Sequence, residues 1–128
     1  MVLLDTCALI WWTLDPGQLS EKATAVCNDI TKTSAVISSI SIWEIGIKIK
    51  KGSLDLGIGI EEYVARLKQL DRLSIIPVDE DIWLESINLD WAHKDPADRA
   101  IVATAKLESV PIVTKDEIIK QFYSRVIW

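Results

Sequence analysis

The stretch Val2-Leu3-Leu4-Asp5-Thr6 consists of three apolar residues that end abruptly at an acid and a hydroxyl. Short apolar runs of this kind are typical of buried strands. Comparable runs recur along the chain at residues 35–37, 75–76, 111–113 and 125–127. The opening stretch therefore predicts the first strand of a sheet, with an acidic side chain at the strand's carboxyl end.

Segments with helical spacing separate these strand candidates. Ser20 is a good N-cap for a helix whose apolar positions are Ala23, Val26, Cys27 and Ile30. Three later segments repeat the helical spacing, through Tyr63, Leu67 and Leu70, then Trp83 and Ile87, then Ile101, Ala105 and Glu108. Alternating strands and helices predict a three-layer α/β/α sandwich with a central parallel sheet of four or five strands. We expect a single domain over residues 1–128.

One segment carries two conflicting patterns. Ile45, Ile47 and Ile49 alternate with glycine and lysine, which favours a strand. Ser41 and Glu44 have the spacing of a capping box, which favours the start of a helix. We expect a helix here.

Four acids follow strand candidates or lie near helix starts: Asp5, Glu44, Asp98 and Asp116. Each has a simple alternative role as a helix cap or a helix-dipole partner, and Asp95 before Pro96 is the clearest cap of all. Taken together, the four acids indicate a common site, because the carboxyl ends of parallel strands meet at one edge of a sheet. Clustered carboxylates repel one another, and a divalent cation such as Mg²⁺ or Mn²⁺ removes that cost. Zinc is not expected without a His or Cys cluster.

The composition narrows the possible classes of protein. The chain has 128 residues and a formal net charge of -5, which argues against a broad basic surface for nucleic acid. No apolar run approaches the length of a membrane span, and the N-terminus does not resemble a signal peptide. Cys7 and Cys27 form neither a metal-ligand spacing nor a disulfide framework, so we expect a reducing, cytoplasmic location and read Cys7 as a small buried residue.

Four motifs in order resemble those of PIN-domain ribonucleases, and most of all the VapC toxins of toxin–antitoxin pairs. They are Leu3-Leu4-Asp5-Thr6, Ser41-Ile42-Trp43-Glu44-Ile45 with Lys48, Asp95-Pro96-Ala97-Asp98-Arg99 leading into Ala103-Thr104-Ala105, and Val113-Thr114-Lys115-Asp116. The similarity runs through nearly the whole chain. Each motif is weak alone, and the specificity comes from their order.

The resemblance implies that Asp5, Glu44, Asp98 and Asp116 bind Mg²⁺ or Mn²⁺ and are the catalytic residues, with Asp95 as a cap or peripheral group. It implies that the hydroxyls of Thr6 and Thr114 orient the carboxylates. The implied activity is metal-dependent endonucleolytic cleavage of RNA by an activated water, leaving a 5′-phosphate and a 3′-hydroxyl. The implied partners are RNA and a cognate antitoxin, in a homodimer or a toxin–antitoxin hetero-oligomer.

Other residues are candidates for contacts with substrate or partner. Lys48 and Arg99 lie near the acids in sequence, and His93, expected at a helix end, with Trp91 precedes the Asp95 turn, where the pair is able to meet an unpaired base. Trp11 and Trp12 form an unusually apolar stretch that suits either the core or a partner groove.

Several alternatives to a toxin remain open. A phosphoacceptor receiver domain needs an acidic pair after the first strand, and a haloacid-dehalogenase-like phosphatase needs an acid where Cys7 stands, so both fit poorly. A PIN nuclease acting in RNA processing or on DNA, and a non-catalytic binding module with the PIN fold, are the alternatives that the residues still allow.

Overall fold

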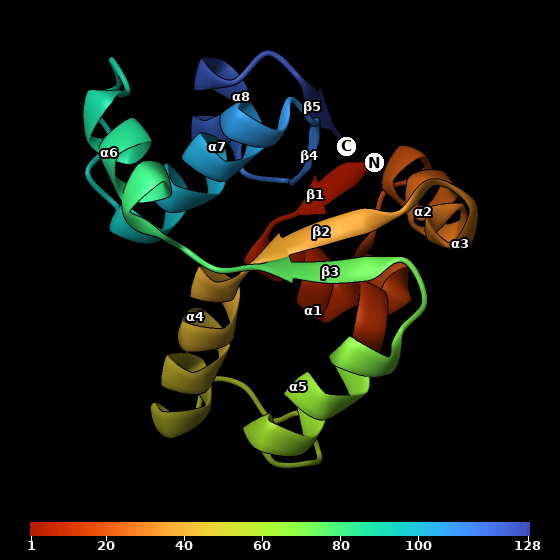
Figure 1. Cartoon of the computed structure of the whole chain (residues 1–128). Helices are drawn as coiled ribbons and strands as arrows, with labels where there is room; N and C mark the ends of the chain where they lie inside the picture. Colours follow the sequence, from red (N-terminus) through yellow and green to blue (C-terminus); the bar gives the residue numbers. More distant parts are fainter.

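The computed structural model describes residues 1–128 and contains one five-stranded sheet (Figure 1). The strands lie in the order β3-β2-β1-β4-β5, and every neighbouring pair is parallel. Their bounds are Val2–Leu4 for β1, Ala35–Ser38 for β2, Leu73–Ile76 for β3, Ile112–Val113 for β4 and Val126–Ile127 for β5. The predicted parallel sheet is confirmed, with five strands.

Helices cover both faces of the sheet, which confirms the three-layer α/β/α prediction (Figure 1). The bounds are α1 Thr6–Leu14, α2 Glu21–Asn28, α3 Ile30–Thr33, α4 Ser39–Lys50, α5 Ile60–Gln69, α6 Glu80–Asn88, α7 Pro96–Glu108 and α8 Glu117–Phe122. A short 3₁₀ turn, η1, spans Pro16–Gln18. None of these helices has the length and apolar character needed to cross a membrane.

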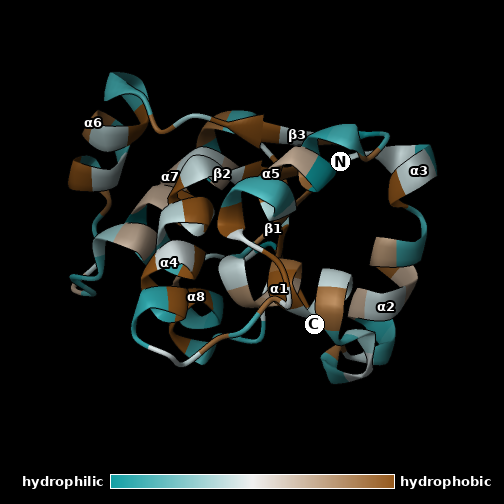
Figure 2. Ribbon diagram, turned by 90° about the horizontal axis from the view of Figure 1, so that it is seen from below, coloured by the Kyte–Doolittle hydropathy of each residue, from teal (hydrophilic) through white to brown (hydrophobic).

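The three central strands, β2, β1 and β4, are buried on both faces and are apolar except for Ser38 at the end of β2. In β1 the fully buried Leu4 packs in a cluster with residues of α1, α2, α3, α4 and α5, whereas Leu3 packs in a second cluster with residues of α7 and α8. Most of the hydrophilic colour lies on the helices and loops rather than on the central strands (Figure 2). The period of two within each strand thus assigns alternate residues to the two helical layers.

Two helices differ in detail from the sequence-based expectation. In α6, Trp83 and Ile87 are exposed by 39% and 71%, so the helix buries Ile82 instead and packs mainly against α7. Leu70, expected within a helix, is the C-cap of α5 and is 40% exposed. Helical spacing found these segments but did not identify which apolar residues face the core.

The ambiguous segment is helical, as expected, but the predicted capping box is wrong. The N-cap of α4 is Ser38, whose Oγ accepts a hydrogen bond from the N–H of Ile40. Ser41 and Glu44 lie inside the helix, three positions apart and therefore on one face. Both contact Thr6 of α1 instead of capping their own helix.

The strand order places a crevice beside β1. The chain proceeds from β1 to β2 on one side of the sheet, and β4 later pairs with β1 on the other side. Such a switch point opens a space at the carboxyl ends of the strands, and open α/β sheets bind their ligands there. Asp5 follows β1 directly, and Thr114 to Asp116 follow β4.

Candidate active site

A single open pocket of about 390 Å³ lies at this edge of the sheet and collects the predicted acids. It is lined by Asp5, Glu44, Asp98 and Asp116, together with Thr6, Cys7, Trp11, Lys48, Asp95, Ile101 and Lys115. The four acids come from the ends of β1 and β4 and from α4 and α7. Residues spread over more than a hundred positions of sequence therefore line one concave surface.

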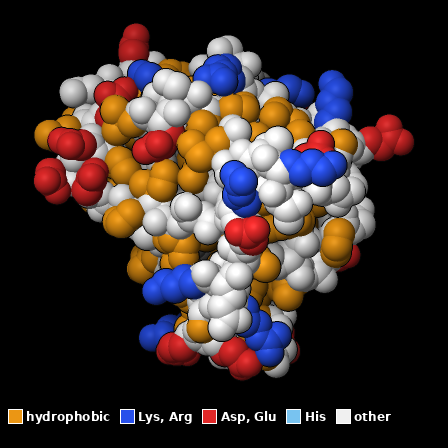
Figure 3. All heavy atoms as spheres, turned by 45° about the vertical axis from the view of Figure 1, so that its right-hand side comes forward, with side chains coloured by type: hydrophobic (Ala, Val, Ile, Leu, Met, Phe, Trp, Pro, Cys, Tyr) orange, Lys and Arg blue, Asp and Glu red, His pale blue; other side chains and the backbone are white.

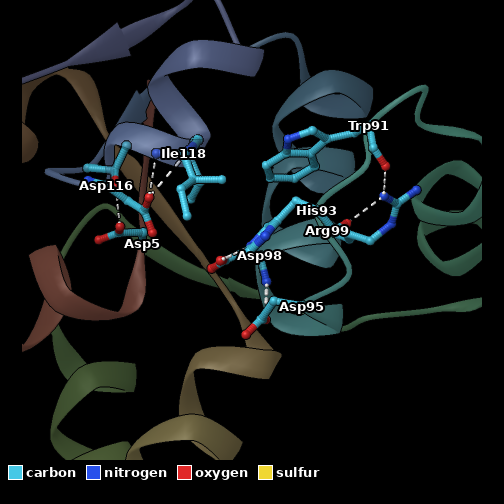
Figure 4. Close-up of polar contacts among 10 residues, drawn as sticks. Asp5, Trp91, His93, Asp95, Asp98, Arg99, Asp116 and Ile118 are labelled. Carbon is cyan, nitrogen blue, oxygen red and sulfur yellow. Dashed lines mark hydrogen bonds and ion pairs between the residues drawn. The ribbon is translucent and has the colours of Figure 1, made fainter.

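Asp5 and Asp116 are joined through Thr114. Asp5 caps α1 with Oδ1, which accepts from the N–H of Ala8 at 2.8 Å, while its Oδ2 accepts from the hydroxyl of Thr114. The same hydroxyl accepts from the N–H of Asp116 at 3.0 Å. Asp116 in turn caps α8 with Oδ1, which accepts from the N–H of Ile118 at 2.8 Å (Figure 4). Asp5 and Asp116 are thus helix caps and also line the acidic pocket.

Glu44 is held by a second chain of hydroxyls. The hydroxyl of Thr6 donates to Glu44 Oε1. Thr6 Oγ1 also lies 2.9 Å from Ser41 Oγ, and because the proton of Thr6 is given to Glu44, Ser41 is the donor to Thr6. Thr6 and Ser41 are both buried, so the position of this carboxylate is fixed from the α1 side.

Asp98 faces the other acids from α7. Its Oδ2 lies 2.7 Å from Nε2 of His93, and its N–H donates to Asp95 Oδ1 at 3.0 Å (Figure 4). Asp95 is therefore the N-cap of α7, as predicted, although it also lines the pocket. The His93 ring packs at 4.9 Å on Trp91, and Trp91 is stacked at 4.6 Å on Phe122.

Burial and like charge raise the pKa values of three of these acids. Burial raises the pKa of Asp5 to about 6, and the charges of Asp98 and Asp116 add to the rise. The pKa values of Glu44 and Asp98 are also raised, chiefly by burial and then by neighbouring carboxylates. These shifts mean that ionising the cluster costs free energy, which a bound cation would offset.

The donor atoms suit a hard divalent cation. Glu44, Asp98 and Asp116 each fix one carboxylate oxygen in a hydrogen bond and leave the other without a partner in the protein. No three or more His, Cys, Asp or Glu side chains lie close enough together to hold a metal ion by themselves. An ion in this open pocket would therefore keep several waters, as Mg²⁺ commonly does.

The structure places the three predicted substrate contacts differently from one another. Lys48 lines the pocket one turn of α4 beyond Glu44. His93 contacts Asp98, but it lies in the irregular segment before α7 rather than at a helix end. Arg99 points away from the pocket (Figure 4), and its guanidinium donates five hydrogen bonds of 2.6–3.0 Å to the carbonyls of Ser86, Leu89, Trp91 and His93. Arg99 thus holds the segment between α6 and α7, and we no longer expect it to bind substrate.

Sequence reasoning missed some residues of the pocket. Cys7, read as buried, is half-buried and lines it, and burial raises the pKa of its thiol. Trp11 and Lys115 also line it. The position of Lys115 between Thr114 and Asp116 was the available signal, whereas nothing local distinguished Trp11 from Trp12.

Fold and site together define a class: a three-layer α/β/α protein with a carboxylate-lined pocket at the switch point of a parallel sheet. The sequence matches the family model described as PIN domain over residues 2–124. The chain therefore belongs to the PIN domain family.

Individual relatives agree with this assignment. Ribonuclease VapC22 of Mycobacterium tuberculosis is 26% identical over 116 residues, covering 90% of this chain and 86% of that protein. The structure FitAcB from Neisseria gonorrhoeae is similar with a TM-score of 0.67 and 26% identity, covering 98% of this chain and 96% of the other. A toxin–antitoxin complex from Klebsiella pneumoniae has a TM-score of 0.69 at 21% identity, covering 100% and 97%, and shares the fold.

Proposed function

We propose that this protein is a metal-dependent endoribonuclease and the toxin of a toxin–antitoxin pair. The observation that carries the proposal is the convergence of Asp5, Glu44, Asp98 and Asp116 on one pocket, each with its carboxylate oriented by a hydrogen bond. Membership of the PIN domain family and the similarity to a ribonuclease support it.

The four acids are the proposed metal ligands and catalytic residues, with Mg²⁺ or Mn²⁺ as the cofactor. When bound, such an ion lowers the pKa of a water and neutralises charge on the scissile phosphate. The protein's part is to hold the carboxylates ionised and correctly aimed. Thr114 does this for Asp5, Thr6 for Glu44 and His93 for Asp98.

A divalent cation must bind in this acidic pocket before the RNA substrate does. The pocket holds five acids and two lysines, and RNA is a polyanion. The face drawn in Figure 3 carries acidic and basic side chains in small groups, without a continuous basic surface. Phosphate binding at this site therefore depends on divalent cations, with Lys48 as the proposed direct contact on α4.

The proposed antitoxin site is an apolar groove separate from the catalytic pocket. It measures about 350 Å³ and is lined by Trp12, Leu14, Leu56, Ile58, Leu67 and Leu70, with Thr13, Tyr63 and Arg66. An amphipathic helix of a partner fits such a groove through the apolar side chains of one face. The solved relatives include toxin–antitoxin complexes, which supports this assignment, and a cytoplasmic location belongs to the same proposal.

The experiment is cleavage of total RNA and of labelled oligoribonucleotides with Mg²⁺, with Mn²⁺ and with chelator. We expect cleavage only with a divalent ion, and products that accept ligation through a 5′-phosphate. Cleavage that persists in chelator, or no cleavage of any RNA, would contradict the nuclease proposal. Cleavage of DNA in preference to RNA would favour the alternative of a PIN nuclease outside toxin biology.

The toxin part has a separate test. Co-expression with the protein encoded beside it is expected to yield a complex with reduced nuclease activity. Leu70→Asp, at an exposed leucine of the apolar groove, is expected to abolish the complex while leaving cleavage intact. A free, fully active nuclease in the co-expression would identify a processing enzyme instead.

A further inference from the structure

Trp11 and Trp12 are adjacent in sequence but open onto different surfaces. Trp12 lines the apolar groove, whereas Trp11 lines the acidic pocket beside the four carboxylates. Trp11 is half-buried, so part of its indole ring remains accessible. An accessible indole inside a pocket of charged groups is not explained by core packing.

The surroundings of Trp11 keep its ring in place. Trp128 at the C-terminus packs against it with ring centroids 5.7 Å apart and an interplanar angle of 49°. The ammonium group of Lys115 lies 5.9 Å from the Trp11 ring centroid, near the outer limit of a cation–π contact. A ring supported from one side needs little ordering when a ligand stacks on it.

Lys115 is an exposed cation without an ion-pair partner. It is exposed, it forms no ion pair with any acid of the chain, and it lies between Thr114 and Asp116 of the site. Its weak contact with Trp11 is easily given up for a phosphate. An aromatic ring beside a lysine is the combination with which proteins bind single-stranded nucleic acid.

We propose that Trp11 and Lys115 form a nucleotide subsite of the active-site pocket, in which an unpaired base stacks on Trp11 and an adjoining RNA phosphate pairs with Lys115. This inference rests on the proposed nuclease function, and it adds a requirement for single-stranded substrate. Bases in a duplex are not free to stack on a side chain. Binding therefore selects loops and unpaired segments next to the scissile bond.

The test is equilibrium binding of fluorescein-labelled single-stranded oligoribonucleotides with Mg²⁺, measured by anisotropy on a Glu44→Gln background that prevents cleavage. Stacking of one base is worth roughly 10- to 100-fold in affinity, so Trp11→Ala is expected to weaken binding by that factor and Trp11→Phe by much less. Lys115→Met is expected to weaken it by about 3- to 10-fold and to reduce its salt dependence. Trp83→Ala, at an exposed tryptophan of α6, is the matched control and should bind within two-fold of the parent.

A second arm locates the base that stacks on Trp11. An abasic nucleotide is moved through the oligoribonucleotide one position at a time, and one position should lose affinity with the parent protein but not with Trp11→Ala. A flat abasic profile with the parent protein, or equal profiles for both proteins, would overturn the subsite. Because binding is measured without cleavage, this result is separate from failure of the nuclease proposal, which only the cleavage assay detects.

Discussion

Thr114 and Asp5 are 109 positions apart in sequence, yet the buried hydroxyl of Thr114 donates a hydrogen bond to Asp5 Oδ2. The hydroxyl oxygen of Thr114 in turn accepts a hydrogen bond from the backbone N–H of Asp116. One threonine thus fixes the carboxylate of Asp5 and the backbone of Asp116, because adjacent parallel strands β1 and β4 end side by side. This contact links the fold directly to the proposed chemistry.

Thr114→Val is expected to cost about 1–3 kcal/mol of unfolding free energy, because it leaves the Asp116 N–H and Asp5 Oδ2 without a partner. It should also raise the pKa of Asp5 further and lower the cleavage rate by at least about ten-fold. Thr114→Ser should restore most of both. Thr104→Val is the control, since that equally buried hydroxyl donates only to Ala100 within α7. Equal losses in the two valine variants would show that Thr114 acts only through packing.

The raised pKa of Asp5 predicts that the stability of the metal-free protein depends on pH. Burial raises its pKa from 3.8 to about 6, so between these values the folded state binds more protons than the unfolded state. The free energy of unfolding therefore falls as the pH rises through this window, by up to about 3 kcal/mol for this group. Asp5→Asn should flatten that fall. Urea denaturation in chelator at closely spaced pH values measures the free energy of unfolding as a function of pH. If this free energy falls equally with pH in Asp5→Asn and in the wild type, Asp5 is not the group responsible.

Arg99 is expected to matter for stability rather than for RNA binding. Its five hydrogen bonds, to the carbonyl of Ser86 within α6 and to three carbonyls of the segment between α6 and α7, predict a loss of about 2–4 kcal/mol of unfolding free energy in Arg99→Lys. Lysine cannot reproduce the planar fork of the guanidinium. Arg125→Met is the control, since Arg125 is exposed and donates a single bond, to the carbonyl of Ser109. If Arg99→Lys unfolds like the wild type but binds RNA poorly, Arg99 contacts substrate after all.

Lys48 is expected to contribute to RNA binding through its charge. Lys48→Met should raise KM for an oligoribonucleotide about 3- to 10-fold and reduce the salt dependence of binding, with little change in stability. Lys51→Met is the control, because Lys51 follows the same helix but does not line the pocket. Equal effects of both substitutions would indicate a general charge effect instead.

The sheet and the positions of Asp5, Asp95 and Asp116 could be predicted because they depend on local sequence. An apolar run followed by an acid specifies a strand end and a cap, and parallel topology then brings the ends together. The partners of Ser41 and Glu44 could not be predicted in this way. Their spacing suits a capping box, but the competing contact is with Thr6, which lies 35 positions from Ser41.

Arg99 and Trp11 show the same limit. The motif around Asp98 gives no sign that the Arg99 side chain turns towards carbonyls of another segment, because those carbonyls belong to residues 6–13 positions earlier in the chain. Trp11 and Trp12 look equivalent in sequence, and only the packing of α1 against its neighbours assigns them to different pockets.

The most direct test of the central claim compares five single substitutions in one assay. Asp5→Asn, Glu44→Gln, Asp98→Asn and Asp116→Asn are each expected to reduce Mn²⁺-dependent RNA cleavage by at least about 100-fold, as expected for loss of a metal ligand. Asp95→Asn changes an acid that lines the same pocket but serves as the cap of α7, a role that asparagine fills equally well. It should retain activity within about three-fold. Loss of activity in Asp95→Asn alone, or full activity in any two of the other four, would contradict the proposed site.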